Sequence, residues 1–260
     1  MNLSELRQAI ESLPMPRYKG KSNIWLGHRM KLRECILNPT KGDIKSFPAW
    51  FMHWPTIQAT MYIGQAPYIQ LELDEVLQLY DSNICEPGKF FHEPTEWNGL
   101  STNLIHQAYH LVQFETRLGI RIRELDTIIE FGGGYGAMAL VAFRMGFEGD
   151  YYIYDFPEFS ILQRYYLSHQ PEVGNVYWNE YLQDFDLCIA IHSLSEVDNI
   201  DDRWEFLIRY PAMSYLFAYS RMQNEIDNHA WFGDLQETNM DWLNWQIEHL
   251  PGKFYLVGAE

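Results

Sequence analysis

The sequence predicts an α/β protein with a Rossmann-like, mostly parallel sheet, helices on both faces and a helical N-terminal extension. Three observations carry this prediction. From residue 127 onward, short β-branched or aromatic runs alternate with helical patterns, which indicates a parallel sheet. The segment EFGGGYG at 130–136 joins the first strand to a helix start through a tight glycine turn. Asp155 then ends the second strand, at the edge of the sheet where ligands bind.

The individual elements follow from hydrophobic periodicity and from helix breakers. Pro14 and Pro16 end the first helix, and Gly119 lies where a helix C-terminus is expected. We divide the chain into a helical region, 1–120, and a nucleotide-binding domain, 121–260. The predicted helices are 3–13, 22–38, 71–80, 100–118, 136–146, 157–168, 201–209 and 235–249. The predicted strands are 127–131, 150–154, 175–178, 186–192, 213–219 and 254–257.

Two kinds of cofactor loop compete for the glycine turn. Gly132, Gly134 and Ala137 fit the dinucleotide pattern G-x-G-x-x-G/A. Glu130 with Gly132, Gly134 and Gly136 fits the S-adenosylmethionine pattern acid-x-G-x-G-x-G. A carboxylate at this place repels a pyrophosphate but suits the ammonium group of a methionine moiety, so we favour S-adenosylmethionine. An acid that binds the ribose hydroxyls is common to both cofactor classes.

The chain resembles the bacterial sugar O-methyltransferases, a family within the S-adenosylmethionine-dependent class I methyltransferases. The resemblance covers residues 128 to 200 and has a weaker echo at 54–57. It implies methyl transfer to a sugar hydroxyl in a glycan or nucleotide-sugar, as in polysaccharide biosynthesis, with S-adenosylhomocysteine as product. It also implies that residues 1–120 cap the cofactor or build the acceptor pocket. The matching segments are EFGGGYG at 130–136, YDFPE at 154–158, YYLS at 165–168, SLSE at 193–196 and WPTI at 54–57.

A class I sheet closes with two strands after the fifth, but only one clear candidate follows here. From the strand ends and the resemblance we assign His192 and Glu196 to catalysis, because an imidazole beside the sulfonium suits removal of the acceptor proton. His192 is the first choice; the alternative is that it hydrogen-bonds the backbone and only packs on the cofactor. Glu196 could orient His192, bind sugar hydroxyls or be the base itself. The residues assigned to the cofactor are Glu130, Gly132, Gly133, Gly134, Tyr135, Gly136, Asp155, Phe156 and Ser193.

Other candidate groups remain open. His106 and His110 lie one helical turn apart, but their spacing supplies no third ligand, so we assign no metal site and a divalent metal is not supported. His92 and Glu93, in a loop at 85–99 that we interpret as a lid, are alternative bases. Aromatic residues expected near the pocket suit stacking on sugar rings, although such residues more often form core; they are Trp97, Tyr135, Phe156 and Trp231.

Composition limits the partners. The net charge of −16 argues against a nucleic-acid substrate. Three cysteines without metal-ligand spacing, no long apolar run and no signal peptide favour a cytoplasmic protein without a membrane span. We expect a small-molecule or carbohydrate acceptor, and the sequence leaves a homo-oligomer open. The rival functions are a methyltransferase of another small molecule, a non-catalytic binding protein that keeps the fold, and an NAD-dependent oxidoreductase.

Overall fold

A computed structural model of the chain describes residues 1–17, 24–38, 66–88, 96–180, 184–223 and 225–260. The WPTI segment, His92 and Glu93 lie outside the described residues. The helices are α1 (Leu3–Ser12), α2 (Ile24–Leu37), α4 (Ala66–Val76), α5 (Thr102–Leu118), α6 (Ala137–Arg144), α7 (Pro157–Leu167), α8 (Ile200–Arg209) and α9 (Asn228–Leu235). The strands of the main sheet are β3 (Thr127–Phe131), β4 (Asp150–Tyr154), β5 (Val176–Trp178), β6 (Phe185–Ile191), β7 (Ala212–Ser220), β10 (Asp241–Gln246) and β11 (Lys253–Ala259).

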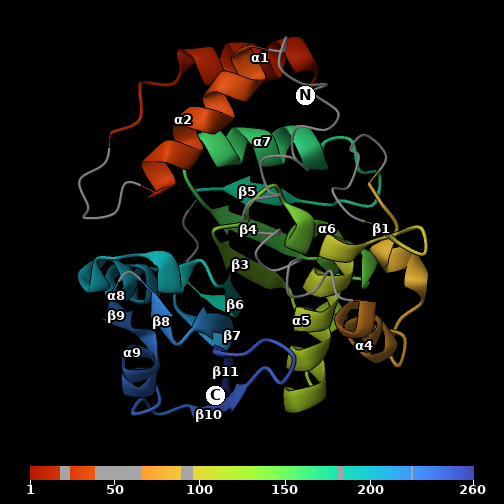
Figure 1. Cartoon of the computed structure of the whole chain (residues 1–260), viewed down its shortest axis with the longest axis vertical. Helices are drawn as coiled ribbons and strands as arrows, with labels where there is room; N and C mark the ends of the chain where they lie inside the picture. Colours follow the sequence, from red (N-terminus) through yellow and green to blue (C-terminus); the bar gives the residue numbers. More distant parts are fainter. Residues whose placement is uncertain (18–23, 39–65, 89–95, 181–183, 224) are drawn as a thin grey trace.

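A seven-stranded sheet forms the centre of the molecule (Figure 1). Its order is β5-β4-β3-β6-β7-β11-β10. Strands β3 to β7 run parallel, whereas β11 is antiparallel to both of its neighbours. The predicted fold class is therefore confirmed: a mostly parallel Rossmann-like sheet behind a helical extension. Two small hairpins, β1 (Glu96–Trp97) with β2 (Leu100–Ser101) and β8 (Met222–Gln223) with β9 (Ile226–Asp227), lie outside it.

The sheet separates two hydrophobic cores. Successive side chains of a strand point to opposite faces. Ile128 and Tyr151 enter the core that also contains residues of α5, α6 and α7, whereas Ile129 and Tyr152 enter the core formed with α8 and α9. Both faces of the central strands are covered, which explains why these strands read as continuous apolar runs.

The N-terminal helices are joined directly to this framework. Helices α1 and α2 pack on α7 (Figure 1), where the fully buried Glu158 accepts from Arg29 at 2.8 Å and from Arg33 at 3.4 Å. Helix α4 packs on α5, and α5 packs on α6 and β11. The Ser101 side chain caps α5, and Gly119 ends it in the left-handed conformation, as expected.

The predicted helix at 235–249 is wrong. Helix α9 ends at Leu235, and β10 occupies 241–246 in register with β11, so that Trp242 pairs with Gly258. The apolar residues of this segment fit helical spacing, but pairing with a strand distant in sequence determines its structure. The sheet consequently has two strands after the fifth parallel one, in agreement with the class that the sequence resembles.

Candidate active site

The glycine loop between β3 and α6 depends on backbone conformations that glycine supplies. Gly132, Gly134 and Gly136 have φ angles of 75°, 57° and 101°. The Gly132 N–H donates to the Tyr154 carbonyl at 2.8 Å, which fixes the loop to β4. A Cβ placed on Gly132 would lie 2.5 Å from the Cβ of Ser193, so a side chain does not fit there.

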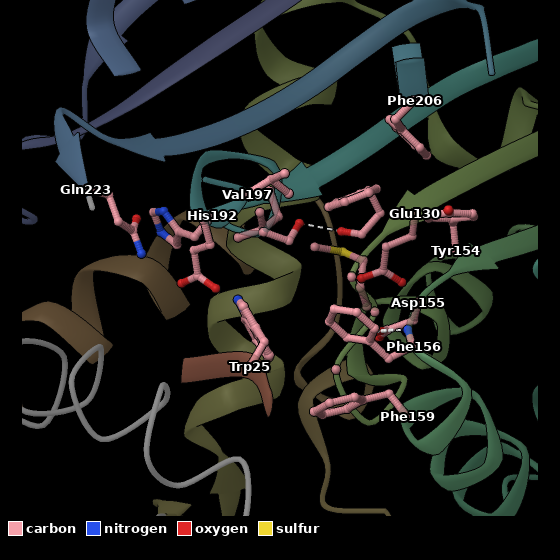
Figure 2. Close-up of a pocket in the computed structure, with 18 of the residues that line it drawn as sticks. Trp25, Glu130, Tyr154, Asp155, Phe156, Phe159, His192, Val197, Phe206 and Gln223 are labelled. Carbon is pink, nitrogen blue, oxygen red and sulfur yellow. Dashed lines mark hydrogen bonds between the residues drawn. The ribbon is translucent and has the colours of Figure 1, made fainter. Parts of the chain in front are cut away.

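A cavity of about 1800 Å³ follows the carboxyl edge of the parallel strands. Figure 2 shows its two ends. Glu130, Asp155 and Phe156 lie beside the glycine loop, at what we call the glycine-loop end. His192 and Gln223 lie at the opposite end, which we call the histidine end. The cavity is larger than most pockets that bind a single small molecule.

Glu130 brings a carboxyl group with one hydrogen bond to the glycine-loop end. Its side chain is 5% exposed, and the Tyr151 hydroxyl donates to it at 2.9 Å. Among the described residues no basic side chain pairs with it. Burial raises the pKa of Glu130 to about 8, and the nearby Asp155 raises it too, although the Tyr151 bond opposes this. The group is therefore suited to accept a ligand cation.

Asp155 is held with the glycine loop by one amide. The Gln163 Nε2 donates to Asp155 Oδ2 at 2.8 Å and to the Gly134 carbonyl at 3.0 Å. Asp155 Oδ1 also accepts from the Phe156 N–H at 2.7 Å. Burial raises the pKa of Asp155 to about 7, and these hydrogen bonds oppose the rise. No sequence pattern points to Gln163, because its role comes from the packing of α7 against the loop.

His192 and Glu196 follow β6 at the histidine end. His192 has φ 62°, which is unusual for a residue with a side chain, and its N–H donates to the Ala218 carbonyl at 2.7 Å. Its Nδ1 atom is buried without a hydrogen-bond partner in the described part of the chain. Burial holds the pKa of His192 well below its usual range, and Lys253 and His106 add to this. Burial raises the pKa of Glu196 to about 7, against a hydrogen bond with Gln223 and the charge of Lys253.

A buried arginine fixes the backbone around Glu196. Arg203 of α8 is fully buried and donates to the carbonyls on both sides, Ser195 at 2.9 Å and Val197 at 2.7 Å. A third bond, to Asn228 Oδ1 at 2.7 Å, connects the loop to α9. The sequence analysis missed this residue, since nothing local distinguishes it from a surface arginine of an amphipathic helix.

A buried polar cluster lies behind the histidine end. The Glu72 carboxylate contacts His106 Nδ1 at 2.9 Å and His249 Nε2 at 2.6 Å, and the His106 and His110 Nε2 atoms are 3.0 Å apart. The Tyr255 hydroxyl contacts His110 Nδ1. With Glu72 ionised, one arrangement of ring protons satisfies every bond: His106 and His249 donate to Glu72, His110 donates to His106, and Tyr255 donates to His110.

Most residues that the sequence assigned to the site come together here. The cavity lining includes every one of them except Gly136, which is the N-cap residue of α6. His106 also lines the cavity, whereas Trp97 and Trp231 do not. In the described part of the chain, no group of three or more His, Cys, Asp or Glu is arranged to hold a metal ion, and no helix is long and apolar enough to cross a membrane.

No protein-family model and no curated protein matches the chain. Solved structures resemble it weakly. An S-adenosylmethionine-dependent methyltransferase from Aquifex aeolicus is 14% identical with a TM-score of 0.40, over 51% of this chain and 80% of that one. The mitomycin 7-O-methyltransferase is 13% identical with a TM-score of 0.40, over 61% of this chain and 57% of that one. A glycopeptide N-methyltransferase complexed with sinefungin is 12% identical with a TM-score of 0.43, over 57% of this chain and 83% of that one. Likenesses of this size do not establish a function.

Proposed function

We propose that the protein is an S-adenosylmethionine-dependent O-methyltransferase. The observation that carries the proposal is Glu130, a buried carboxyl group directly before the glycine turn, with no basic partner among the described residues. An ammonium group satisfies this carboxylate, whereas a pyrophosphate is repelled by it. The sheet supports the same cofactor class, because dinucleotide-binding folds of this type have the order 3-2-1-4-5-6, without the reversed strand β11.

The remaining cofactor residues fit the same ligand. Asp155 is placed to accept hydrogen bonds from ribose hydroxyls, and the Phe156 ring lies at the same end of the cavity. Gly132, Gly133, Gly134, Tyr135 and Ser193 also line the cavity, and Gly136 is the N-cap residue of α6. When bound, S-adenosylmethionine supplies an activated methyl group; the residues of this chain hold the acceptor and remove its proton.

Glu196 is the proposed base, with His192 as a neutral hydrogen-bonding group beside it. A base works best when its pKa lies near the working pH, and the pKa of Glu196 is about 7. His192, our first choice from the sequence, is a weaker base because burial lowers its pKa. The acceptor hydroxyl loses its proton to the Glu196 carboxylate while Gln223 orients that carboxylate.

A hydroxylated acceptor such as a sugar suits the histidine end. Gln223 offers there an amide group that both donates and accepts, as hydroxyl groups require, and Gln107 adds a second amide to the lining of the cavity. The Asn103 amide instead donates to the Tyr135 hydroxyl at 2.7 Å. Trp25 of α2 also lines the cavity, but its ring lies beside that of Phe156 at the glycine-loop end, with the ring centroids 6.2 Å apart. Helix α2 therefore contributes to the wall near the cofactor in this proposal.

Cofactor binding should depend on pH through Glu130. Since the carboxyl group must ionise to pair with an ammonium, affinity for S-adenosylhomocysteine should fall by up to about tenfold for each pH unit below about 8. Below about pH 7, protonation of Asp155 should steepen the fall. Calorimetric titration at several pH values measures this. Glu130→Gln should bind weakly and lose the dependence near pH 8; equal affinity of the wild type across this range would contradict the pairing.

Turnover should depend on Glu196. Glu196→Gln keeps the hydrogen bond to Gln223 but cannot take a proton, so we expect the rate to fall by about 100-fold or more, with unchanged affinity for S-adenosylhomocysteine. The assay incubates the protein with S-adenosylmethionine and a panel of free sugars and nucleotide-sugars, and detects S-adenosylhomocysteine. Glu148→Gln, an exposed carboxyl group, is the matched control. Full activity of Glu196→Gln would exclude Glu196 as the base.

A further inference from the structure

Lys253 reaches the histidine end through the reversed strand. It is the first residue of β11, which runs antiparallel to β7, so its amino end lies at the carboxyl edge of the parallel strands. Lys253 pairs with Ser220, and the Arg221 N–H donates to the Gly252 carbonyl at 2.9 Å. The His192 N–H donates to the carbonyl of Ala218, which lies in β7 two residues before Ser220. Three adjacent strands thus bring these groups to one wall.

The ammonium group of Lys253 makes fewer hydrogen bonds than it has donors. Its Nζ donates to the Ser220 hydroxyl, and the side chain lines the cavity. An ammonium group carries three N–H donors, and Ser220 takes one. Among the described residues, no other group accepts a hydrogen bond from the Lys253 Nζ atom. Burial lowers the pKa of Lys253, whereas the charge of Glu196 opposes this and favours the ammonium form.

The groups around Lys253 are those that the proposed reaction uses. His192 and Glu196 face it from the loop after β6, His106 faces the cavity from α5, and Arg221 follows Ser220 on the β7 side. Lys253 lowers the pKa of both His192 and Glu196 by its charge. A cation in this position favours the ionised form of Glu196 and the neutral form of His192.

We propose that Lys253 is a catalytic residue that binds the acceptor oxygen between Glu196 and His192. The inference rests on the proposed function. As the acceptor O–H bond breaks, the proton passes to the Glu196 carboxylate and the oxygen forms its bond to the methyl carbon that leaves the sulfonium. Lys253 keeps its own proton and donates a hydrogen bond to that oxygen, which stabilises the negative charge developing on it.

The test uses Lys253→Met, Lys253→Arg and the matched surface control Lys31→Met, whose residue pairs with Glu34 on an exposed helix face. Nuclear magnetic resonance follows the His192 ring and the Glu196 carboxyl carbon during pH titration of the S-adenosylhomocysteine complex. Removing the positive charge should raise both titration midpoints, by about one pH unit, because the charge of Lys253 lowers the pKa of both groups. Lys253→Arg should restore them, and Lys31→Met should change nothing.

Turnover and cofactor affinity together distinguish the role of Lys253 from the proposed function on which it rests. With an acceptor from the panel, Lys253→Met should lose about 100-fold or more in kcat, and Lys253→Arg should recover part of it, while affinity for S-adenosylhomocysteine stays within about twofold in all variants. A wild type that does not bind S-adenosylhomocysteine would contradict the proposed function. Binding by every variant, with unmoved midpoints in Lys253→Met, would overturn the role of Lys253 alone.

Discussion

Gly132→Ala should lower the free energy of unfolding by about 3 kcal/mol and weaken S-adenosylhomocysteine binding by at least about tenfold. The reason is a combination of two costs at one position. The φ of 75° disfavours any residue with a Cβ, and that Cβ would lie 2.5 Å from the Cβ of Ser193, which must then move away from the Phe131 carbonyl that its hydroxyl contacts. Urea unfolding and calorimetry measure the two effects.

Gly119→Ala is the control for Gly132→Ala. Gly119 has nearly the same φ, 72°, but a Cβ there has no atom within 4 Å. Gly119→Ala should lower the free energy of unfolding by about 1 kcal/mol, without any effect on cofactor affinity. If Gly132→Ala and Gly119→Ala behave alike, close contact between the loop and Ser193 does not matter to binding.

Glu72→Ala should lower the free energy of unfolding by about 3–5 kcal/mol, because it removes the shared acceptor of two buried imidazoles. The loss should appear as a fall in Tm of roughly 10 °C for a chain of this size. Glu34→Ala, which breaks an exposed ion pair with Lys31, should lower the free energy of unfolding by less than about 1 kcal/mol. A small change in Glu72→Ala, comparable to that of Glu34→Ala, would show that the cluster is not held by this carboxylate.

The effect of Glu72 should also depend on pH. Burial alone would raise the pKa of Glu72, but the contacts with His106 and His249 hold it below the ordinary 4.5. A carboxyl group whose folded pKa is lowered stabilises the protein above its unfolded pKa and loses this contribution as it is protonated. The stability difference between wild type and Glu72→Ala should therefore be complete above about pH 5 and shrink at lower pH.

The sequence was sufficient for the parts of the site that are local. Glu130, the glycines and Asp155 lie next to strand ends that periodicity identifies, and the parallel arrangement brings those ends to one edge. The same logic placed His192 and Glu196 on the cavity. Local pattern could not distinguish β10 from a helix, because Trp242, Leu243 and Trp245 fit both spacings until β11 pairs with them.

The residues that the sequence did not identify depend on contacts between distant segments. Glu72 is 34 residues from His106 and 177 from His249, yet it contacts both. Lys253 became a site residue only because β11 is reversed, a strand whose partner the sequence analysis had read as helix. Arg203 and Gln163 act through backbone carbonyls and a neighbouring carboxylate, which no spacing in the chain encodes.

The most direct test of the central claim is calorimetric titration of the purified protein with S-adenosylhomocysteine at about pH 8, near the pKa of Glu130, with NAD titrated in parallel. We predict micromolar binding of S-adenosylhomocysteine and no binding of NAD. Binding of NAD without S-adenosylhomocysteine would contradict the account, because Glu130 would then face a pyrophosphate.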